Sequence, residues 1–296
     1  MSVHENVLPI ESSTQLLARK DGRVGSILEE QGKLGSAEIG KVLELQRTKG
    51  IRFGEAAVRL GLISSDDLLG AVAKQYGFPH LSPGSAGVSR ELVSAYEPFH
   101  PRSEELRAVR TQLLIRWSNT GIRRRMLAVV SPGNGEGRSY LAANLAVVFS
   151  QLGQRTLLID ADLRSPRQHR IFNVANRVGL SSVLSGRADL GAVSVVPGLG
   201  TLSLLPSGAC PPNPQELLLS PAFSVLLDEL EAAFDIILFD TPPARMYADA
   251  QGVAFRAGSA LVLTRKDKTR VADAAGVIRD LEDSGAHVVG TLFNAV

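Results

Sequence analysis

The sequence contains one cysteine, one tryptophan and four tyrosines among its 296 residues, and each scarcity excludes a class of protein. The single thiol, Cys210, cannot form a disulfide within the chain, which is typical of proteins from a reducing compartment. Aromatic residues are too few and too scattered for a surface on which nucleic acid bases stack. No apolar run reaches the roughly 18 residues of a membrane helix, and the N-terminus lacks the basic and apolar blocks of a signal peptide. These absences predict a cytoplasmic protein.

The sequence also lacks an excess of charge of one sign. The formal net charge is +2, and the only tight basic run, Arg123–Arg125, is explained by a solvated loop before a strand. We therefore expect no nucleic acid polymer as a partner. The hydrophobic fraction of 44% and the length of 296 residues predict a globular protein with one large and one small domain.

A glycine-rich segment indicates a nucleotide-binding site. The apolar residues Met126–Val130 predict a buried strand, and Leu141–Leu152 predict a helix. Between them, Gly133, Gly135 and Gly137 allow backbone N–H groups to point into one concavity at the helix N-terminus. Such a loop suits a triphosphate, and a turn of purely structural use is the alternative for this motif alone. The expected nucleotide-binding residues are Gly133, Asn134, Gly135, Glu136, Gly137, Arg138, Ser139 and Tyr140.

Two positions of this loop differ from the common phosphate-loop pattern G-x-x-x-x-G-K-[ST]. Pro132 stands at the first glycine, and Arg138 stands at the lysine that reaches the phosphates. Ser139 keeps the hydroxyl that commonly binds Mg²⁺. Arginine keeps the positive charge of lysine but is bulkier and forked, so the loop predicts nucleotide binding before it predicts catalysis.

Aspartates follow two further apolar segments that are typical of buried strands. Asp160 and Asp162 follow Thr156–Ile159. Asp240 follows Ile236–Phe239. The carboxyl ends of strands in an open α/β sheet border the crevice where ligands bind, so these side chains should meet near the glycine loop. One carboxylate there can bind Mg²⁺ and another can accept a proton from an attacking hydroxyl, whereas a cap or turn explains any one of them alone.

Strands and helices alternate through the rest of the chain. The expected strands are residues 202–205, 260–264 and 288–293. The expected helices are residues 167–172 and 180–184, two helices across 215–233, and residues 249–256 and 272–283. This alternation predicts an α/β fold, a P-loop NTPase-type and mostly parallel sheet with helices on both faces. A small, mainly helical N-terminal domain is expected before it.

Two units near the N-terminus repeat each other without a gap. Arg23–Gln46 and Arg52–Gln75 align at a constant offset of 29 residues. Matched apolar positions say only that both units pack alike, as a helical docking module would. Two arginines and two glutamines are also retained, and they have no role in a core, which favours equivalent sites for an anionic, nearly two-fold ligand. Ser64 with Asp67 predicts a capping box for the last helix of the second unit.

These units resemble the cyclic di-GMP-binding N-terminal domain (MshEN) of pilus and type II secretion ATPases. The resemblance rests on the R-x-G start, the later glycine and the final glutamine of each unit, whereas Glu29 and Lys33 stand where that family has apolar residues. It implies cyclic di-GMP as an effector. The residues implied are Arg23, Gly25, Gly32, Gln46, Arg52, Gly54, Gly61 and Gln75.

Residues 79–102 carry four prolines and two glycines, which is typical of a linker or a loosely packed connection. A helix is then expected from Ser103 to about Trp117. Glu104, Arg107 and Arg110 share one face of it, which fits either a salt bridge within the helix or contact with a neighbouring subunit. The expected domains are an N-terminal arm (1–20), a tandem-repeat domain (21–78), a linker (79–102) and a P-loop domain (103–296).

The motifs S-P-G-N-G-E-G-R-S, L-L-I-D-A-D-L-R and I-I-L-F-D-T-P-P together resemble the bacterial tyrosine kinases (BY-kinases) of exopolysaccharide synthesis, which are cytoplasmic chain-length-determinant kinases. The resemblance covers Ser103–Val296, and ordinary P-loop ATPases lack its second motif. It implies ATP and Mg²⁺ as cofactors, with Ser139, Asp160 and Asp240 at the metal. It further implies Asp160 as the base for an acceptor tyrosine, with Asp162 and Arg138 as the other catalytic residues.

Assembly and partners are implied by the same resemblance. An E-x-x-R-x-x-R helix assembles these kinases, and Glu104, Arg107 and Arg110 match it, which implies a homo-oligomer. The implied partner is a membrane chain-length-determinant (polysaccharide co-polymerase) protein that recruits the kinase to the inner membrane. The chain stops at Asn294-Ala295-Val296 without the C-terminal tyrosine cluster of these kinases, so the acceptor tyrosine is expected elsewhere.

Three functions remain open on the sequence. The first is an ATP-dependent tyrosine kinase or ATPase that regulates exopolysaccharide chain length and export and responds to cyclic di-GMP. The second is a catalytically weak, nucleotide-binding scaffold in the same machinery. The third is a partitioning or cell-division-positioning ATPase, which is disfavoured because the extra phosphate-loop lysine of that group would fall at Gly133.

Overall fold

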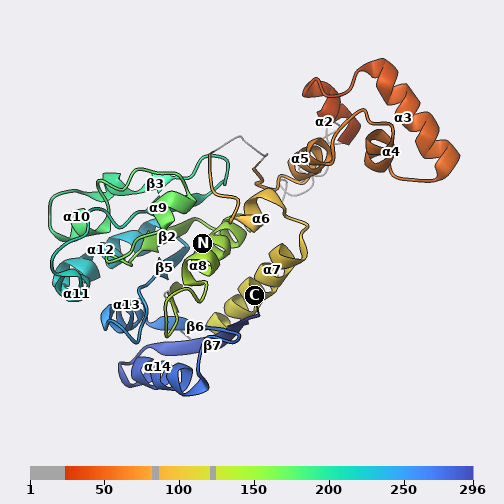
Figure 1. Ribbon diagram of the computed structural model, residues 1–296. Coiled ribbons are helices and arrows are strands. Elements are labelled where there is room, and N and C mark those ends of the chain that lie inside the picture. Colours follow the sequence, from red (N-terminus) through yellow and green to blue (C-terminus); the bar gives the residue numbers. More distant parts are fainter. Residues whose placement is uncertain (1–23, 82–86, 121–124, 296) are drawn as a thin grey trace, which may run out of the picture. The chain divides into compact units, whose positions relative to one another are not determined.

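The computed structural model describes residues 24–81, 87–120 and 125–295, and the chain divides into two compact units, Met1–Phe78 and Pro79–Val296 (Figure 1). The described part of the first unit is helical. Its helices are α2 (Val24–Glu30), α3 (Ser36–Lys49), α4 (Phe53–Arg59) and α5 (Ser65–Gln75). They pack around a small apolar core whose fully buried members are Leu28, Val42, Ala56, Ala57 and Ala71.

The two sequence repeats adopt the same order of helix, glycine turn and longer helix. Gly32 after α2 and Gly61 after α4 have φ values of +68° and +67°, a conformation that residues with a Cβ rarely adopt. The repeats also contact each other through charge, because Lys33 Nζ lies 2.9 Å from Asp67 Oδ1. Lys33, which departs from the apolar pattern of the resembled domain, therefore bridges the two repeats.

A capping box begins α5, which confirms the prediction for Ser64 and Asp67. Asp67 N donates to Ser64 Oγ at 3.1 Å, and Ser64 N donates to Asp67 Oδ2 at 3.0 Å. These reciprocal bonds satisfy donors that the first helical turn leaves without partners. Hydrogen bonds from Lys33 and then from Ser64 stabilise the carboxylate, so the pKa of Asp67 falls from 3.8 to about 2.

The second unit is built on a seven-stranded sheet with the strand order β3-β4-β2-β5-β1-β6-β7 (Figure 1). The strands are β1 (Met126–Val130), β2 (Thr156–Asp160), β3 (Ser194–Val195), β4 (Leu202–Leu205), β5 (Ile236–Asp240), β6 (Ser259–Arg265) and β7 (His287–Asn294). Neighbouring strands are parallel, except that β3 pairs antiparallel with β4 at one edge. The predicted α/β fold with a mostly parallel sheet is confirmed.

Helices cover both faces of this sheet (Figure 1). They are α6 (Val93–Tyr96), α7 (Pro101–Thr120), α8 (Arg138–Ser150), α9 (Gln168–Ile171), α10 (Leu180–Leu184), η1 (Leu190–Ala192), α11 (Pro214–Leu219), α12 (Pro221–Ala233), α13 (Asp249–Ala257) and α14 (Val271–Asp283). Along β1, Leu127 and Val129 join an apolar cluster with α7 and α8. Met126, Ala128 and Val130 join a second cluster with α12, α13 and α14. Burial on both faces explains why the central strands are continuous apolar runs.

Residues 79–102 are not a linker, so that prediction was wrong. Leu92 is fully buried in the cluster that includes α8, and Tyr96 is 5% exposed. Ser94 N donates to Asn144 Oδ1 at 3.2 Å, and Gln151 Nε2 donates to Ser94 O at 2.7 Å. The described part of this segment packs through a few apolar side chains, and residues 82–86 within it lie outside the described residues. The second unit therefore begins at Pro79.

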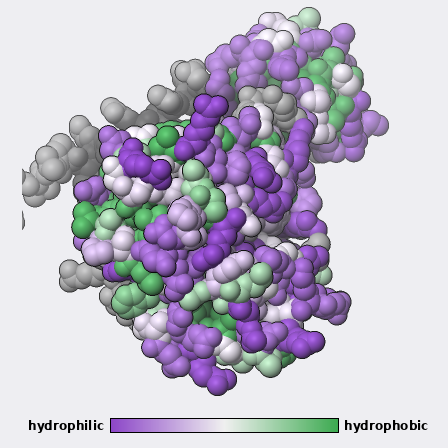
Figure 2. Space-filling model, turned by 60° about the vertical axis from the view of Figure 1, so that its left-hand side comes forward, coloured by the Kyte–Doolittle hydropathy of each residue, from purple (hydrophilic) through white to green (hydrophobic). Residues whose placement is uncertain are grey.

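Hydrophilic residues dominate the face shown in Figure 2, with smaller apolar areas between them. The most exposed large apolar side chains lie on different elements, for example Val271 (85%) on α14, Val195 (67%) on β3 and Val225 (58%) on α12. Within the described residues, no helix is long and apolar enough to cross a membrane.

Candidate nucleotide-binding site

The glycine loop joins β1 to the N-terminus of α8, where the sequence predicts it. Gly135 and Gly137 have φ values of +66° and +102°, so both positions favour a residue without a Cβ. Space is limited as well, since a Cβ on Gly137 would approach Asn294 Nδ2 to 2.9 Å. A loop of this shape at a helix N-terminus presents N–H groups and the positive end of the helix dipole, which is an arrangement suited to phosphate.

Glu136 holds the loop from within and is only 2% exposed. Gly133 N donates to Glu136 Oε2 at 2.7 Å, and Thr269 Oγ1 donates to Glu136 Oε1. Asn294 Nδ2 donates to the main-chain oxygen of Glu136 at 3.1 Å. Because its carboxylate is occupied in this way, Glu136 can contribute to a nucleotide site through its backbone and through the shape of the loop.

Two cations, one at the end of β6 and one in the turn after it, reach the tip of the loop. Arg265 Nη1 donates to Gly135 O at 2.7 Å, and Lys268 Nζ lies 3.4 Å from the same oxygen. Sequence analysis missed both residues, which follow no recognisable motif. The signal that finds them is the sheet itself, because β6 pairs in parallel with β1 and their carboxyl ends therefore meet.

The guanidinium of Arg138 is bound to the protein, and the residue is 6% exposed. Arg138 Nε donates to Thr241 O at 2.5 Å. Its Nη1 donates to Ser131 Oγ at 2.6 Å and to Gly133 O at 3.0 Å, while Nη2 lies 4.0 Å from Asp162 Oδ2. A planar fork with five N–H donors can make these bonds in several directions, whereas a lysine carries three donors on one atom. Arg138 thus fastens the glycine loop to the end of β5.

Asp160 and Asp240 lie side by side at the carboxyl ends of β2 and β5. Their Cα atoms are partners in the sheet register, and both residues are fully buried. Asp160 Oδ2 accepts the backbone N–H groups of Arg167 at 3.0 Å and Gln168 at 2.9 Å. Asp160 Oδ1 and Asp240 Oδ1 have no hydrogen-bond partner among the described residues. Buried carboxylate oxygens without a partner are costly, and they are candidate ligands for a cation.

Gln168 connects these carboxylates to the glycine loop, although sequence analysis did not select it. Its Nε2 donates to Asp240 Oδ2 at 2.8 Å and to Ser139 O at 3.0 Å. The residue is fully buried, and its Oε1 has no partner in the described part of the chain. Gln168 lies in a helix of four residues, which is too short to show a periodic pattern. The only signal in the sequence is that Gln168 follows Asp160 by eight residues.

Burial raises the pKa of both aspartates. For Asp160, loss of hydration lifts the pKa well above its usual range, and the charge of Asp240 adds to this. For Asp240, burial also raises the pKa, while the charge of Arg138 and hydrogen bonds from Gln168 and Ser139 oppose it. Two adjacent carboxylates in an apolar site do not both ionise readily, so the pair favours binding either a proton or a cation.

Asp162 lies next to this pair and shapes the turn after β2. Its Oδ1 accepts the N–H groups of Arg164 at 3.2 Å and Ser165 at 2.9 Å. Arg164 Nε donates to Asp249 Oδ2 at 2.8 Å, and its guanidinium lies 4.2 Å from the ring centroid of Tyr247. The turn that carries Asp162 is thereby held against the start of α13. Arg164 is the last residue of the second sequence motif, whereas Asp249 lies in no motif, and neither was selected as a site residue.

The structure therefore brings together Arg138, Asp160, Asp162 and Asp240, which are far apart in the sequence, and Gln168 joins them to Ser139. Asn134 is exposed on the loop, with Nδ2 3.4 Å from Met246 Sδ. Tyr140 is half-buried, and burial raises the pKa of its phenol.

The face of α7 that carries Glu104, Arg107 and Arg110 contacts its own chain. Arg107 Nη1 donates to Glu104 Oε2 at 2.9 Å, and Arg107 Nη2 donates to Pro98 O at 2.5 Å. Arg110 Nη1 donates to Val148 O at 2.7 Å, and its burial lowers the pKa of the guanidinium. The salt bridge within the helix is present, and Glu104 remains 75% exposed on its surface.

In the first unit, seven of the eight residues expected at cyclic di-GMP lie in the described part of the chain, and Arg23 lies outside it. Arg52 and Gln75 are exposed and Gln46 is half-buried, all at helix ends. The helical glycines serve packing, since a Cβ on Gly54 would come within 2.2 Å of Leu68 Cδ1. The remaining described residues of the expected cyclic di-GMP site are Gly25, Gly32 and Gly61.

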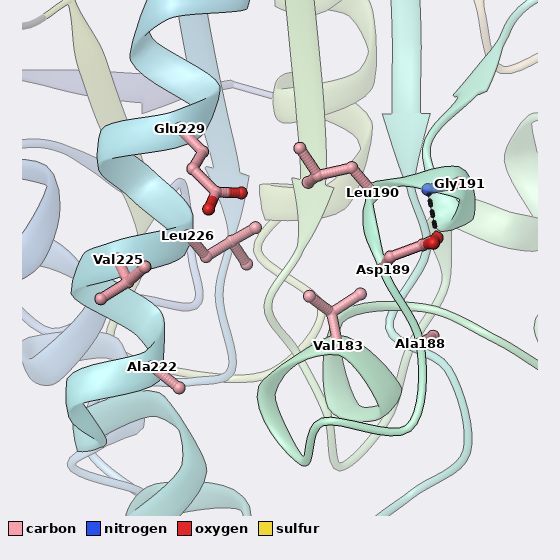
Figure 3. A pocket seen from close by; sticks show the side chains of 9 residues that line it. All are labelled: Val183, Ala188, Asp189, Leu190, Gly191, Ala222, Val225, Leu226 and Glu229. Atoms are coloured by element: carbon pink, nitrogen blue, oxygen red, sulfur yellow. Dashed lines mark hydrogen bonds between the residues drawn. The ribbon is translucent and has the colours of Figure 1, made fainter.

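A separate hollow of about 620 Å³ lies between α10, η1 and α12 (Figure 3). Its walls include Val183, Leu190 and Leu226, and its charged lining residues are Asp189 and Glu229. Asp189 Oδ1 accepts the N–H of Gly191 at 2.9 Å. Two carboxylates without a lining cation disfavour phosphate, so the nucleotide site is assigned to the glycine loop.

The sheet is mostly parallel, a glycine loop lies at the N-terminus of α8, and aspartates end the neighbouring strands β2 and β5. These features define a P-loop NTPase-type protein. No protein-family model matches the chain. The chain is 37% identical over 207 residues to the tyrosine-protein kinase YwqD of Bacillus subtilis (strain 168). The matched region covers 70% of this chain and 86% of YwqD. The chain belongs to the family of bacterial tyrosine-protein kinases.

Two further similarities agree with this membership. The putative tyrosine-protein kinase EpsB of Ralstonia nicotianae is 35% identical over 208 residues, which is 69% of this chain but 27% of EpsB, so the chain spans about a quarter of that relative. The crystal structure of the chimerical protein CapA2B2 has a TM-score of 0.66 and 32% identity, and the match covers 76% of this chain and 97% of the chimera.

Proposed function

We propose that the second unit is an ATP-dependent protein-tyrosine kinase of exopolysaccharide synthesis and export, and that the first unit makes it responsive to cyclic di-GMP. The observation that carries the kinase is the convergence of Arg138, Asp160, Asp162 and Asp240 beside the glycine loop. The names of the relatives support tyrosine as the acceptor. The connection to polysaccharide export rests on the resemblance of the three sequence motifs.

ATP would bind with its phosphates on the N–H groups of the glycine loop. Gly135 and Gly137 give the loop its curvature, and the N-terminus of α8 adds the favourable end of its dipole. Arg265 and Lys268 supply positive charge at the loop tip, where they contact Gly135 O. Arg138 supplies charge from below the loop, but its bonds to Thr241 O and Ser131 Oγ favour a bracing role over movement with the phosphate.

The donor set fits Mg²⁺ held largely by phosphate and water. Among the described residues, no three His, Cys, Asp or Glu side chains form a metal site of their own. The hydroxyl of Ser139 and the partnerless oxygens of Asp240 and Asp160 are nevertheless hard ligands in one place. When bound, Mg²⁺ would neutralise charge on the transferred phosphoryl group.

Asp160 is the residue that we assign as proton acceptor for the attacking phenol. Its Oδ2 is fixed by two backbone N–H groups, which leaves Oδ1 directed away from them without a partner. Gln168 orients the neighbouring Asp240 and the backbone of Ser139. Catalysis of this kind depends mainly on positioning and on charge neutralisation.

Incubation of the purified chain with Mg²⁺ and ATP tests the kinase. We expect ADP release and phosphotyrosine on a random copolymer of glutamate and tyrosine, both abolished by Asp160→Asn. Asp228→Asn, on α12, is a matched control that should retain activity. Nucleotide binding without any phosphotyrosine or ADP would support the second candidate function, a nucleotide-binding scaffold, which is favoured by the bracing contacts of Arg138.

Cyclic di-GMP binding by the first unit is supported by its internal two-fold repeat. Gly32 and Gly61 adopt the same positive-φ turn, and Arg52 and Gln75 are exposed. We expect Arg52→Ala to weaken cyclic di-GMP binding in calorimetry without changing ATP binding. Arg59→Ala is the matched control, because Arg59 is an exposed arginine at the other end of α4, the helix that Arg52 precedes, and it pairs with Glu55 at 2.9 Å. Wild-type protein that gives no heat with cyclic di-GMP would remove this part of the proposal.

Assembly and the membrane partner complete the proposal. A homo-oligomer would use the exposed face of α7, on which Glu104 is 75% exposed. We expect Glu104→Ala to lower the mass found by analytical ultracentrifugation, whereas Glu105→Ala, its exposed neighbour, should not. Co-purification with a membrane polysaccharide co-polymerase would test the partner.

A further inference from the structure

A tyrosine kinase requires a phenol that can enter its site, and this sequence contains four tyrosines, all within the described residues. Their environments differ sharply. Tyr76, at the C-terminal end of α5, is 77% exposed. Tyr96 is 5% exposed, and its hydroxyl donates to Val88 O at 2.8 Å. Transfer to Tyr96 would need both its removal from the core and the loss of this bond.

The other two tyrosines are also constrained. Tyr140 is half-buried and is fixed in the first turn of α8, directly after Ser139. Burial disfavours its ionised form, since the pKa of its phenol is raised. Tyr247 is half-buried, its ring lies under the guanidinium of Arg164 at 4.2 Å, and its N–H donates to Pro243 O at 3.2 Å.

Tyr76 stands where α5 ends and a glycine turn begins. Gly77 has φ of +61°, and no atom lies within 4 Å of where its Cβ would be. Three backbone bonds hold this helix end: Tyr76 N to Val72 O at 3.1 Å, Gly77 N to Lys74 O at 3.1 Å and Phe78 N to Ala73 O at 2.8 Å. The end of a helix frays more easily than its middle, so this segment can straighten and present the phenol in line with a phosphate.

Resting on the kinase function proposed above, we propose that Tyr76 is the phosphoryl acceptor of this chain. Tyr76 Oη forms a bond to the γ-phosphorus of ATP, and the bond between that phosphorus and the β,γ-bridging oxygen breaks. ADP leaves with the electron pair of the broken bond. The phenolic proton passes to a carboxylate, for which Asp160 is the candidate.

Phosphopeptide mass spectrometry of the full chain after incubation with Mg²⁺ and ATP tests this proposal. We expect one phosphate per chain on the peptide that contains Tyr76, lost in Tyr76→Phe and retained in the matched variant Tyr247→Phe. Phosphorylation of the glutamate-tyrosine copolymer should be the same in Tyr76→Phe as in the wild type, because Tyr76 lies outside the nucleotide site.

The outcomes separate this proposal from the kinase itself. Phosphate on Tyr247 or Tyr140, or undiminished phosphate in Tyr76→Phe, would overturn the assignment of Tyr76. A copolymer that is phosphorylated while the chain is not would also overturn it and would leave the kinase standing. Absence of phosphate on both would overturn the two proposals together.

Discussion

Gln168 touches both buried aspartates, donating its side-chain amide to Asp240 Oδ2 at 2.8 Å and its backbone N–H to Asp160 Oδ2 at 2.9 Å. The same amide reaches Ser139 O at 3.0 Å. One residue therefore fixes the orientation of two carboxylates and of the loop residue that carries the hydroxyl. Outer groups that orient the ligands and bases of a site have large effects on activity without contacting the substrate.

We expect Gln168→Met, which keeps the length of the side chain but removes its donors, to lower kcat about 10–100-fold. ADP affinity should change little, since the N–H groups of the glycine loop remain. Gln251→Met is the control, because Gln251 Nε2 also donates one bond, to Asp280 O at 2.8 Å, but does so on the surface. Equal losses of kcat in both variants would contradict a positioning role for Gln168.

Arg138→Lys restores the usual residue of a phosphate loop, yet we expect it to destabilise the nucleotide-free protein. A lysine cannot replace the bonds from Nε to Thr241 O and from Nη1 to Ser131 Oγ together. A buried acceptor left without its donor costs about 1–3 kcal/mol. Thermal unfolding without nucleotide measures the loss. An unchanged melting temperature would show that Arg138 does not brace the loop.

Asp160→Asn should raise the stability of the nucleotide-free protein while it abolishes activity. Burial holds the pKa of Asp160 above its unfolded value, so the carboxyl favours folding at low pH and loses that contribution as pH rises through the folded pKa. The advantage of asparagine should therefore be absent below about pH 4 and grow above it. A gain of about 1 kcal/mol corresponds to about 2–4 °C in Tm. A variant that melts below the wild type at pH 8 would contradict this.

The ion pair between Lys33 and Asp67 should stabilise the first unit at neutral pH and not in strong acid. The pKa of Asp67 is lowered from 3.8 to about 2, so the contribution is present above about pH 4 and is lost as pH falls through about 2. The side chains are 52% and 24% exposed, which limits the coupling to about 0.2–1 kcal/mol.

A double-mutant cycle with Lys33→Met and Asp67→Asn, followed by hydrogen exchange of the α5 amides, measures this coupling. Arg59 and Glu55 form a comparable pair at 2.9 Å, but within one helix and one repeat. This pair is the control for the Lys33–Asp67 pair, which joins the two repeats. Equal coupling at pH 7 and at pH 2 would show that Asp67 does not carry it.

Most of the sheet could be predicted from the sequence because its central strands are fully buried. Such strands are unbroken apolar runs, and those of β1, β2 and β5 each end in a glycine loop or an aspartate. Parallel strands place these ends at one edge, which is why Arg138, Asp160 and Asp240 were expected to meet. The edge strand β3 was missed because it has two exposed residues and no pattern.

The contacts of single polar side chains could not be predicted in the same way. Three residues reach the site only through tertiary packing, namely Gln168, Arg265 and Lys268. Their spacing in the sequence does not indicate these contacts. Residues 79–102 were mistaken for a linker because the short, mostly apolar stretch Leu92–Tyr96 stands between stretches that contain prolines and glycines. This stretch is also held by Asn144 and Gln151, which bind the backbone of Ser94 from 50 and 57 residues further along the chain.

That segment also contacts elements of the nucleotide-binding site. Glu91 Oε2 lies 2.8 Å from Arg167 Nη2, and the backbone N–H of Arg167 donates to Asp160. Asn144 holds the same segment to the helix that starts at the glycine loop. The segment therefore contacts both the turn that orients Asp160 and the helix that begins at the glycine loop, so a substitution that loosens it should disturb two sides of the nucleotide site.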